Sequence, residues 1–189
     1  MAENFKLMTT EMDVSALVRR GERQDGGADN RYVASRKEGR LSREDVIGLI
    51  GEAKALGKFV DLYGRDLREL NLSDLDLTHA NLRNAGLAGA LLIGTRLVDA
   101  KLRNADLSGA DLSFSNLKYA DARYARFKGA NLWHANLWNA DVRYADLSGA
   151  RNLEGALEVG SAVYFSTRVS EGQKGLIEAA LRGTERLIT

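Results

Sequence analysis

Hydrophobic positions return every five residues through the middle of the chain. From Leu62 to Leu147, eighteen consecutive steps carry an apolar residue, which is leucine in all but Ala122, Phe127 and Val142. A small residue, most often alanine, stands two positions before each of these from Ala80 to Ala145. A period of five fits neither an α-helix, at about 3.6 residues per turn, nor a continuous strand, at about two. The pattern therefore indicates an internal repeat.

The repeat predicts a coil rather than a layered fold. Alanine and leucine two residues apart form a strand fragment whose two side chains point the same way. The next two residues must then turn a corner before another inward pair. A chain that bends at constant intervals winds into a coil, in which the leucine and small-residue columns fill the interior and each coil hydrogen-bonds to the next.

A second period shows how many steps make one coil. Arginine recurs at 83, 103, 123 and 143, and glycine at 89, 109, 129 and 149. A spacing of 20 over a spacing of 5 predicts four steps per coil. Eighteen steps then give about four and a half coils, a rod on the order of 20 Å long if coils pair like strands about 4.8 Å apart.

The repeat unit itself is similar to that of a known family. The runs Ala105–Gly109, Ala110–Phe114 and Ala130–His134 follow an Ala-[Asp/Asn]-Leu-x-x pattern, and over about residues 59–150 the chain resembles pentapeptide-repeat proteins. The resemblance implies an all-β solenoid, a right-handed quadrilateral β-helix with flat outer faces. It does not imply one function, because a fold does not determine an activity.

The segment before the repeat, residues 42–58, is predicted to be a capping helix. Ser42 and Asp45 have the spacing of a capping box, and Gly57 is suited to the helix end. The residues expected on the apolar side of this helix, its apolar stripe, are Val46, Ile47, Ile50, Ala53 and Leu56. We favour the interpretation that this helix covers the open end of the coil over a role in partner binding.

The two ends of the chain allow several interpretations. Residues 1–41 form an N-terminal arm, with a short helix at Glu11–Arg20 and a loop at 21–30, that is either mobile or ordered by a partner. Residues 151–189 are expected to form a closing strand near 159–165 and a helical flank over Ser170–Ile188. That helix caps the coil, mediates self-association, or does both. The family resemblance favours a homodimer through this C-terminal segment.

Composition argues against catalysis. The chain has no cysteine and two histidines, His79 and His134, whose separation of 55 residues places them on different sides of the coil. Without a second ligand or triad partner, we expect no metal site, no catalytic residue and no cofactor. The aspartates belong to the repeat, and a filled rod lacks a concave pocket. We also expect no membrane segment, no secretory signal and a cytoplasmic location.

One outward column carries arginines, which we call the arginine column: Arg83, Arg103, Arg123 and Arg143. Tyr124 and Tyr144 directly follow two of them. Like charges about 5 Å apart repel by about 1 kcal/mol per pair in water. Asp121 and Asp141, two positions before two of the arginines, are placed to offset this repulsion, as is stacking on tyrosine. The column is either a self-neutralised ladder or a docking stripe for an acidic partner surface or phosphate, with nucleic acid ranked lower.

A second outward feature is aromatic. Trp133 and Trp138 stand one repeat apart, with Phe114 and His134 beside the first and Tyr119 beside the second. Exposed aromatic groups on a rod with a filled core require an explanation. Either a terminal segment folds back over them or they bind another molecule, because tryptophan, tyrosine and arginine are enriched at binding hot spots.

The sequence thus favours a non-enzymatic interaction or scaffold module that binds a protein partner through a Trp/Tyr/Arg surface. The alternative, implied by the resemblance, is a DNA-mimicking protein that binds type II topoisomerases and protects gyrase from drugs or toxins. That role requires an acidic rod, whereas residues 60–150 hold 11 Arg and Lys against 11 Asp and Glu. Direct binding of nucleic acid ranks third.

Overall fold

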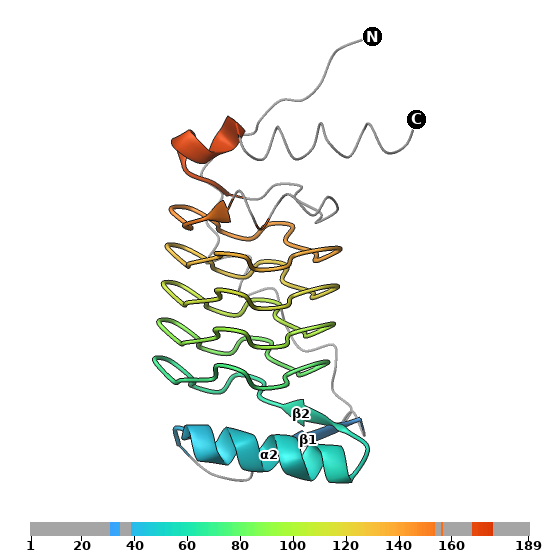
Figure 1. Cartoon of the computed structure of the whole chain (residues 1–189). Helices are drawn as coiled ribbons and strands as arrows, with labels where there is room; N and C mark the ends of the chain where they lie inside the picture. Colours follow the sequence, from blue (N-terminus) through green and yellow to red (C-terminus); the bar gives the residue numbers. More distant parts are fainter. Residues whose placement is uncertain (1–30, 35–38, 154–155, 157–167, 176–189) are drawn as a thin grey trace, which may run out of the picture.

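The computed structural model describes residues 31–34, 39–153, 156 and 168–175. Its named elements are β1 (Tyr32–Ala34), α2 (Arg43–Ala55), β2 (Phe59–Asp61) and the short 3-10 helix η1 (Glu171–Gln173). From β2 to Arg151 the chain winds into stacked coils, and α2, β1 and β2 lie at the N-terminal end of the stack (Figure 1). The fold is therefore a rod with a helical segment across one end.

Parallel bridges connect each coil to the next. Fifteen of them join residues twenty positions apart, from Asp61↔Asn81 to Asn131↔Arg151. The spacing agrees with the 20-residue period of the sequence. We number the coils from Asp61, so that coil 1 is residues 61–80, coil 2 is 81–100, coil 3 is 101–120 and coil 4 is 121–140.

The interior consists of the two predicted columns. The apolar column from Leu62 to Leu147 is at most 1% exposed at every step, and the small residues from Ala80 to Ala145 are at most 2% exposed. Leu70 and Leu75, which depart from the small-residue column, are partly buried against the same core. Every outward function of the rod must therefore be carried by the other three positions of the repeat.

The corners have one conformation throughout. The second residue after each inward leucine has a positive φ at all eighteen steps from Gly64 to Gly149, and twelve of these residues are not glycine. A left-handed conformation costs a non-glycine residue about 1–2 kcal/mol. In twelve repeats the aspartate or asparagine before the leucine accepts a hydrogen bond from the backbone N–H two residues later. This turn explains why the repeat favours Asp or Asn at this position, and it assigns these twelve side chains a structural role.

Helix α2 begins with the capping box that the sequence predicts. The Ser42 side chain accepts from the Asp45 N–H, and the Ser42 N–H donates to the Asp45 carboxylate. Its buried residues are Val46, Leu49 and Ala53. The predicted stripe was wrong at two positions, because Ile47 is 45% exposed and Leu56 is 58% exposed. The rod covers only one narrow side of the helix, and these two residues lie outside it.

Two arginines next to α2 bind the exposed edge of coil 1. Arg43 donates from Nη1 to the Asn71 carbonyl at 2.5 Å and from Nη2 to the Ser73 carbonyl at 3.1 Å, and Arg40 donates to the Arg68 carbonyl. In later coils the equivalent carbonyls accept from the preceding coil; for example, Leu72 N–H donates to Leu91. Coil 1 has no preceding coil, and the two guanidinium groups donate to its carbonyls in place of one. These carbonyls would otherwise form an open edge able to pair with another chain.

The first strand lies within the predicted N-terminal arm. Residues of β1 pair in parallel with β2, with Val33 opposite Val60. A three-residue strand has no detectable period, so the sequence could not reveal it. The predicted helix at Glu11–Arg20 lies outside the described residues.

The C-terminal end of the rod departs from the regular spacing. Asp146 pairs with Arg168, 22 residues later rather than 20. The Gln173 side chain accepts from the Gly149 N–H at 3.2 Å and donates to the Ala150 carbonyl at 2.7 Å, so η1 binds this edge. The predicted closing strand near 159–165 and the predicted helix beyond residue 175 lie outside the described residues.

Candidate interaction surfaces

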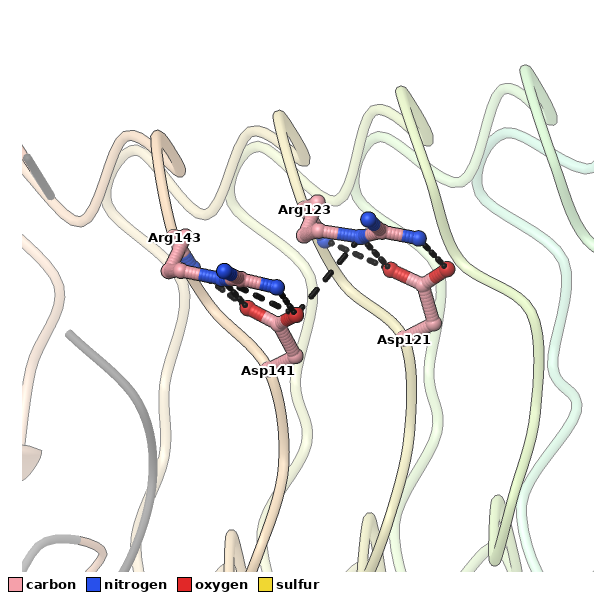
Figure 2. A network of polar contacts seen from close by, with 4 residues as sticks. All are labelled: Asp121, Arg123, Asp141 and Arg143. Atoms are coloured by element: carbon pink, nitrogen blue, oxygen red, sulfur yellow. Dashed lines mark hydrogen bonds and ion pairs between the residues drawn. The ribbon is translucent and has the colours of Figure 1, made fainter. Parts of the chain in front are cut away.

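Half of the arginine column is paired within the chain. Arg123 binds Asp121 with two hydrogen bonds of 2.7 Å each, from Nε and from Nη2. Arg143 binds Asp141 in the same manner at 2.9 and 2.6 Å, and Arg123 Nε also lies 3.6 Å from the Asp141 carboxylate (Figure 2). The four side chains form a continuous ladder across two coils.

The electrostatics of this ladder favour the charged state. Burial disfavours the ionised form of Asp121, but the hydrogen bonds and the charge of Arg123 outweigh it, so the pKa of Asp121 lies below its ordinary 3.8. The hydrogen bond to Asp121 likewise raises the pKa of Arg123, against the opposing effect of burial. Both partners are therefore ionised at neutral pH. The structure brings together the pairs that the sequence predicted to offset arginine repulsion.

The coil 3 arginine has a different environment. Two positions before Arg103 the sequence has Lys101 rather than aspartate. The Arg103 guanidinium lies 5.4 Å from the centre of the Tyr124 ring, and Tyr124 stacks on Tyr144 at 4.8 Å with an interplanar angle of 9°. Lys101 Nζ lies 4.9 Å from the centre of the Tyr32 ring. In coil 3 the cations contact aromatic faces, whereas in the next two coils they contact carboxylates.

The arginine of coil 2 also lacks an aspartate two positions before it. Asn81 occupies that position, and its side-chain amide donates to Asp61 at 2.8 Å. The four predicted arginines are therefore not equivalent, because Arg123 and Arg143 have an aspartate two positions before them and Arg83 has Asn81 there.

The aromatic residues form two clusters. In the first, which we call the Phe114 cluster, the Phe114 ring lies 4.9 Å from Trp133 and 5.3 Å from His134, and Trp133 lies 4.9 Å from His134. Phe114 is 53% exposed and Trp133 is 49% exposed. These are the neighbours that the sequence placed beside Trp133.

The second group, the Trp138 cluster, lies one side further along the coil. Tyr119 and Trp138 contact edge to face at 5.0 Å, and Lys118 Nζ lies 5.6 Å from the centre of the Trp138 ring. Trp133 and Trp138 stand on successive sides because five residues advance the chain by one side. The structure thus offers two adjoining aromatic groups.

Several of these rings occupy strained corner positions. Phe114, Tyr119 and His134 have φ values of 59°, 61° and 52°. Tyr124 and Tyr144, beside the arginine column, have the same left-handed conformation. Glycine and asparagine fill equivalent corners elsewhere at less conformational cost. Aromatic residues at these corners therefore carry a cost that the fold does not require.

Sequence reasoning missed one apolar residue near the Phe114 cluster. Leu91 stands where the repeat has aspartate or asparagine, and it is 40% exposed. Ile93, in the same column as Trp133, is 38% exposed. A leucine side chain cannot accept the corner hydrogen bond. At this corner coil 2 therefore has an exposed apolar side chain in place of the acceptor. The signal was the missing Asp or Asn at position 91.

Little in the described part of the chain suggests chemistry on a small molecule. No group of three or more potential metal ligands occurs there. His79 lies 3.9 Å from Asp99 and its ring contacts Phe59 at a tilt of 47°, whereas His134 belongs to the Phe114 cluster. A shallow, open hollow beside Gly86 holds the Arg68–Asp66 ion pair, whose members satisfy each other at 2.8 Å.

Across the described ranges, no helix is long and apolar enough to cross a membrane.

Comparisons with solved structures return repeat proteins of the same kind. A pentapeptide-repeat protein of the cyanobacterium Cyanothece 51142 is 34% identical, with 51% of this chain and 60% of that protein covered and a TM-score of 0.32. A pentapeptide-repeat protein of Nostoc Pcc 7120 is 29% identical, with 66% and 95% covered and a TM-score of 0.30. QnrB1, a plasmid-mediated fluoroquinolone resistance protein, is 17% identical, with 68% and 76% covered and a TM-score of 0.33. A comparison with curated proteins gives no match.

The family model provides the assignment. The pentapeptide-repeat model matches residues 59–94, 95–133 and 123–156 in eight copies, which is just over half of the chain. Members of this family form right-handed β-helices and are generally non-enzymatic structural or interaction modules. The chain belongs to the pentapeptide-repeat family.

Proposed function

We propose that this protein is a non-enzymatic interaction module that binds a protein partner through its outward aromatic and arginine surface. The observation that carries the proposal is the Phe114 cluster, whose rings are half exposed and stand partly at left-handed corners. Strained residues persist at sites where function demands them. Because the leucine core is already complete, these rings do not fill the interior.

The composition of the two aromatic clusters supports binding to protein. Tryptophan and tyrosine bury large areas with few rotatable bonds, and they are enriched where binding energy is concentrated. Asn131 and Asn136 precede the two tryptophans, and each accepts the N–H of its tryptophan through Oδ1. These hydrogen bonds fix the backbone beneath each ring, so the surface is organised before a partner arrives.

The proposal is tested by removing both tryptophans. We expect the folded double variant Trp133→Ala/Trp138→Ala to lose the proteins that the wild type retains in a quantitative pull-down. Tyr63→Ser is the matched control, because Tyr63 is 55% exposed but lies in coil 1, away from both clusters. Undiminished recovery by the double variant would remove this surface from the proposal.

The alternative function is DNA mimicry directed at gyrase, and the charge distribution disfavours it. Five of the 11 acidic residues of the rod lie in coil 1, around its perimeter: Asp61, Asp66, Glu69, Asp74 and Asp76. The outward column that begins at Asp61 continues as Asn81, Lys101, Asp121 and Asp141, so charge reverses along the rod. Imitation of a phosphate backbone needs an axial acidic strip instead.

A supercoiling assay with purified gyrase separates the two functions. We expect no dose-dependent inhibition and no protection from quinolones. Either effect, if abolished by neutralising rod carboxylates, would favour the alternative.

The proposal includes self-association through the C-terminal segment, which rests on the family resemblance and on the apolar pattern of the sequence. The apolar side expected of that segment is Leu176, Ile177, Ala180, Leu181 and Leu187. Leu176→Asp/Leu181→Asp is the informative variant, because it introduces charge into this side. We expect light scattering to show a dimer for the wild type and a monomer for the variant, and equal masses would contradict this part of the proposal.

A further inference from the structure

We propose that Lys101 and Arg103 bind carboxylate groups of an acidic segment in a partner protein. The inference rests on the proposed function and specifies the chemistry of the partner. It concerns coil 3 of the arginine column, half a coil away from the Phe114 cluster.

The next two coils show what coil 3 lacks. In each of them an aspartate stands two positions before the arginine and binds its Nε and Nη2 groups, which form one edge of the guanidinium, as Figure 2 shows for Asp121–Arg123 and Asp141–Arg143. These pairs are the bidentate arrangement in which guanidinium and carboxylate match best. The repeat places successive arginines one strand spacing apart. Arg103 in coil 3 therefore presents the same donors as Arg123 does in coil 4.

Coil 3 has a cation where the ladder has an anion. Lys101 occupies the position of Asp121 and Asp141, since parallel bridges join Lys101 to Asp121 and Asp121 to Asp141. Lys101 contacts the ring of Tyr32, and Arg103 contacts the ring of Tyr124. A ring face does not accept the N–H groups along the edge of a guanidinium, so these donors of Arg103 stay available. Both oxygens of Asp121 form hydrogen bonds with Arg123, whereas the charge of Arg103 is the smallest of the causes that act on the pKa of Asp121.

The surroundings favour an acidic peptide over nucleic acid. Coil 3 offers two adjacent cations, and Arg123 and Arg143 in the following coils are neutralised by their own aspartates. Affinity for a nucleic acid backbone grows with the number of phosphates neutralised, so two cations suit a short acidic segment better than a polyanion. A glutamate or aspartate of the partner would pair with Arg103 in the same geometry as Asp121 pairs with Arg123.

Binding of a fluorescein-labelled hexaglutamate peptide to the full chain tests this inference. Fluorescence anisotropy at low ionic strength is the readout, because exposed charge pairs weaken with salt. Arg103→Gln should weaken binding by about tenfold, the loss of a charge-assisted hydrogen bond. Lys101→Asp should abolish binding, because the introduced carboxylate would pair with Arg103 as Asp121 pairs with Arg123.

Lys128→Asp is the matched control. It changes the net charge by the same amount on a different side of coil 4, where Lys128 is exposed. We expect its effect to stay within about twofold, and Lys101→Asp should melt no lower than the wild type because coils with aspartate at this position already exist. These two measurements separate local recognition from general charge attraction and from unfolding.

Three outcomes would overturn the inference. They are failure of the wild type to bind hexaglutamate, equal losses with Lys128→Asp and Lys101→Asp, and equally tight binding of a labelled hexathymidylate oligonucleotide. The test is independent of the aromatic surface, since Trp133→Ala/Trp138→Ala should bind the peptide normally. If the pull-down still depends on the tryptophans while the peptide fails to bind, the proposed function stands and only this inference falls.

Discussion

The arginine column and the Phe114 cluster use the same repeat positions in opposite ways. Arg123 and Trp133 both directly follow an inward residue, ten residues apart, on opposite sides of coil 4. The residue two positions earlier is Asp121 in one case and Asn131 in the other. Asp121 forms hydrogen bonds with the Arg123 side chain, whereas Asn131 bonds the Trp133 backbone N–H and other polar side chains, and the Trp133 ring stays half exposed. A single position in the repeat therefore decides whether a surface is internally satisfied or open to a partner.

The largest expected effect separates the surface from the core beneath it. Leu132→Ala should lower the free energy of unfolding by about 2–5 kcal/mol, because Leu132 is fully buried. Trp133→Ala, at the adjacent exposed position, should cost about 1 kcal/mol or less. Urea denaturation followed by circular dichroism measures both. Equal losses would mean that the Trp133 ring belongs to the fold, and the contrast with the arginine column would disappear.

The next effect measures how much stability Asp141 contributes to the side of the rod where arginines pair with aspartates. Asp141→Ala removes both the corner hydrogen bond to the Arg143 N–H and the ion pairs, and should lower stability by about 1–2 kcal/mol. Asp141→Asn retains an acceptor for the corner and should lose about half as much. Identical losses for the two variants would show that the charge, and not the corner hydrogen bond, stabilises this side.

The third test uses pH. Because the folded-state pKa of Asp121 lies below its unfolded value, its contribution is present above the unfolded pKa and is lost as pH falls through the folded pKa. We expect the urea midpoint to fall on acidification below about pH 4, and to fall less in Asp121→Asn. Trp133→Ala/Trp138→Ala should retain the wild-type pH dependence. If Asp121→Asn kept the wild-type pH dependence, the claim that the charge of Asp121 stabilises the arginine side of the rod would be wrong.

The smallest expected change concerns the strained corners. Phe114→Asn should alter stability by less than about 1 kcal/mol, because relief of left-handed strain offsets the lost ring contacts. Asn84, Asn104 and Asn139 already occupy equivalent corners. The same variant should weaken partner recovery in the pull-down. Strong destabilisation without any effect on binding would place Phe114 with the structural residues.

The sequence predicted those features that a local period determines. Columns five residues apart predicted the buried leucines, and the two-residue spacing of Asp121 and Arg123 placed them on one side of the coil. The corner hydrogen bonds were implicit in the Asp and Asn positions, but their role became clear only from the backbone geometry.

Features that depend on distant segments could not be predicted in this way. Arg40 and Arg43 bind carbonyls about 30 residues away, and nothing in their local sequence indicates this. Ile47 and Leu56 fit the periodicity of a helix, yet the narrow end of the rod buries Leu49 instead. The ring contacts within each aromatic cluster depend on side-chain orientation at the corners, which the repeat pattern does not specify.

The coil geometry also constrains how such a rod can change in length. An insertion of five residues would preserve the leucine column, but it would rotate every later surface by a quarter turn relative to α2. Trp133 would then occupy another side, and the pairs built from residues twenty apart would be broken at the insertion. Only a duplication of twenty residues lengthens the rod while keeping its faces aligned. The interior tolerates growth in units of five, whereas the surfaces restrict it to whole coils.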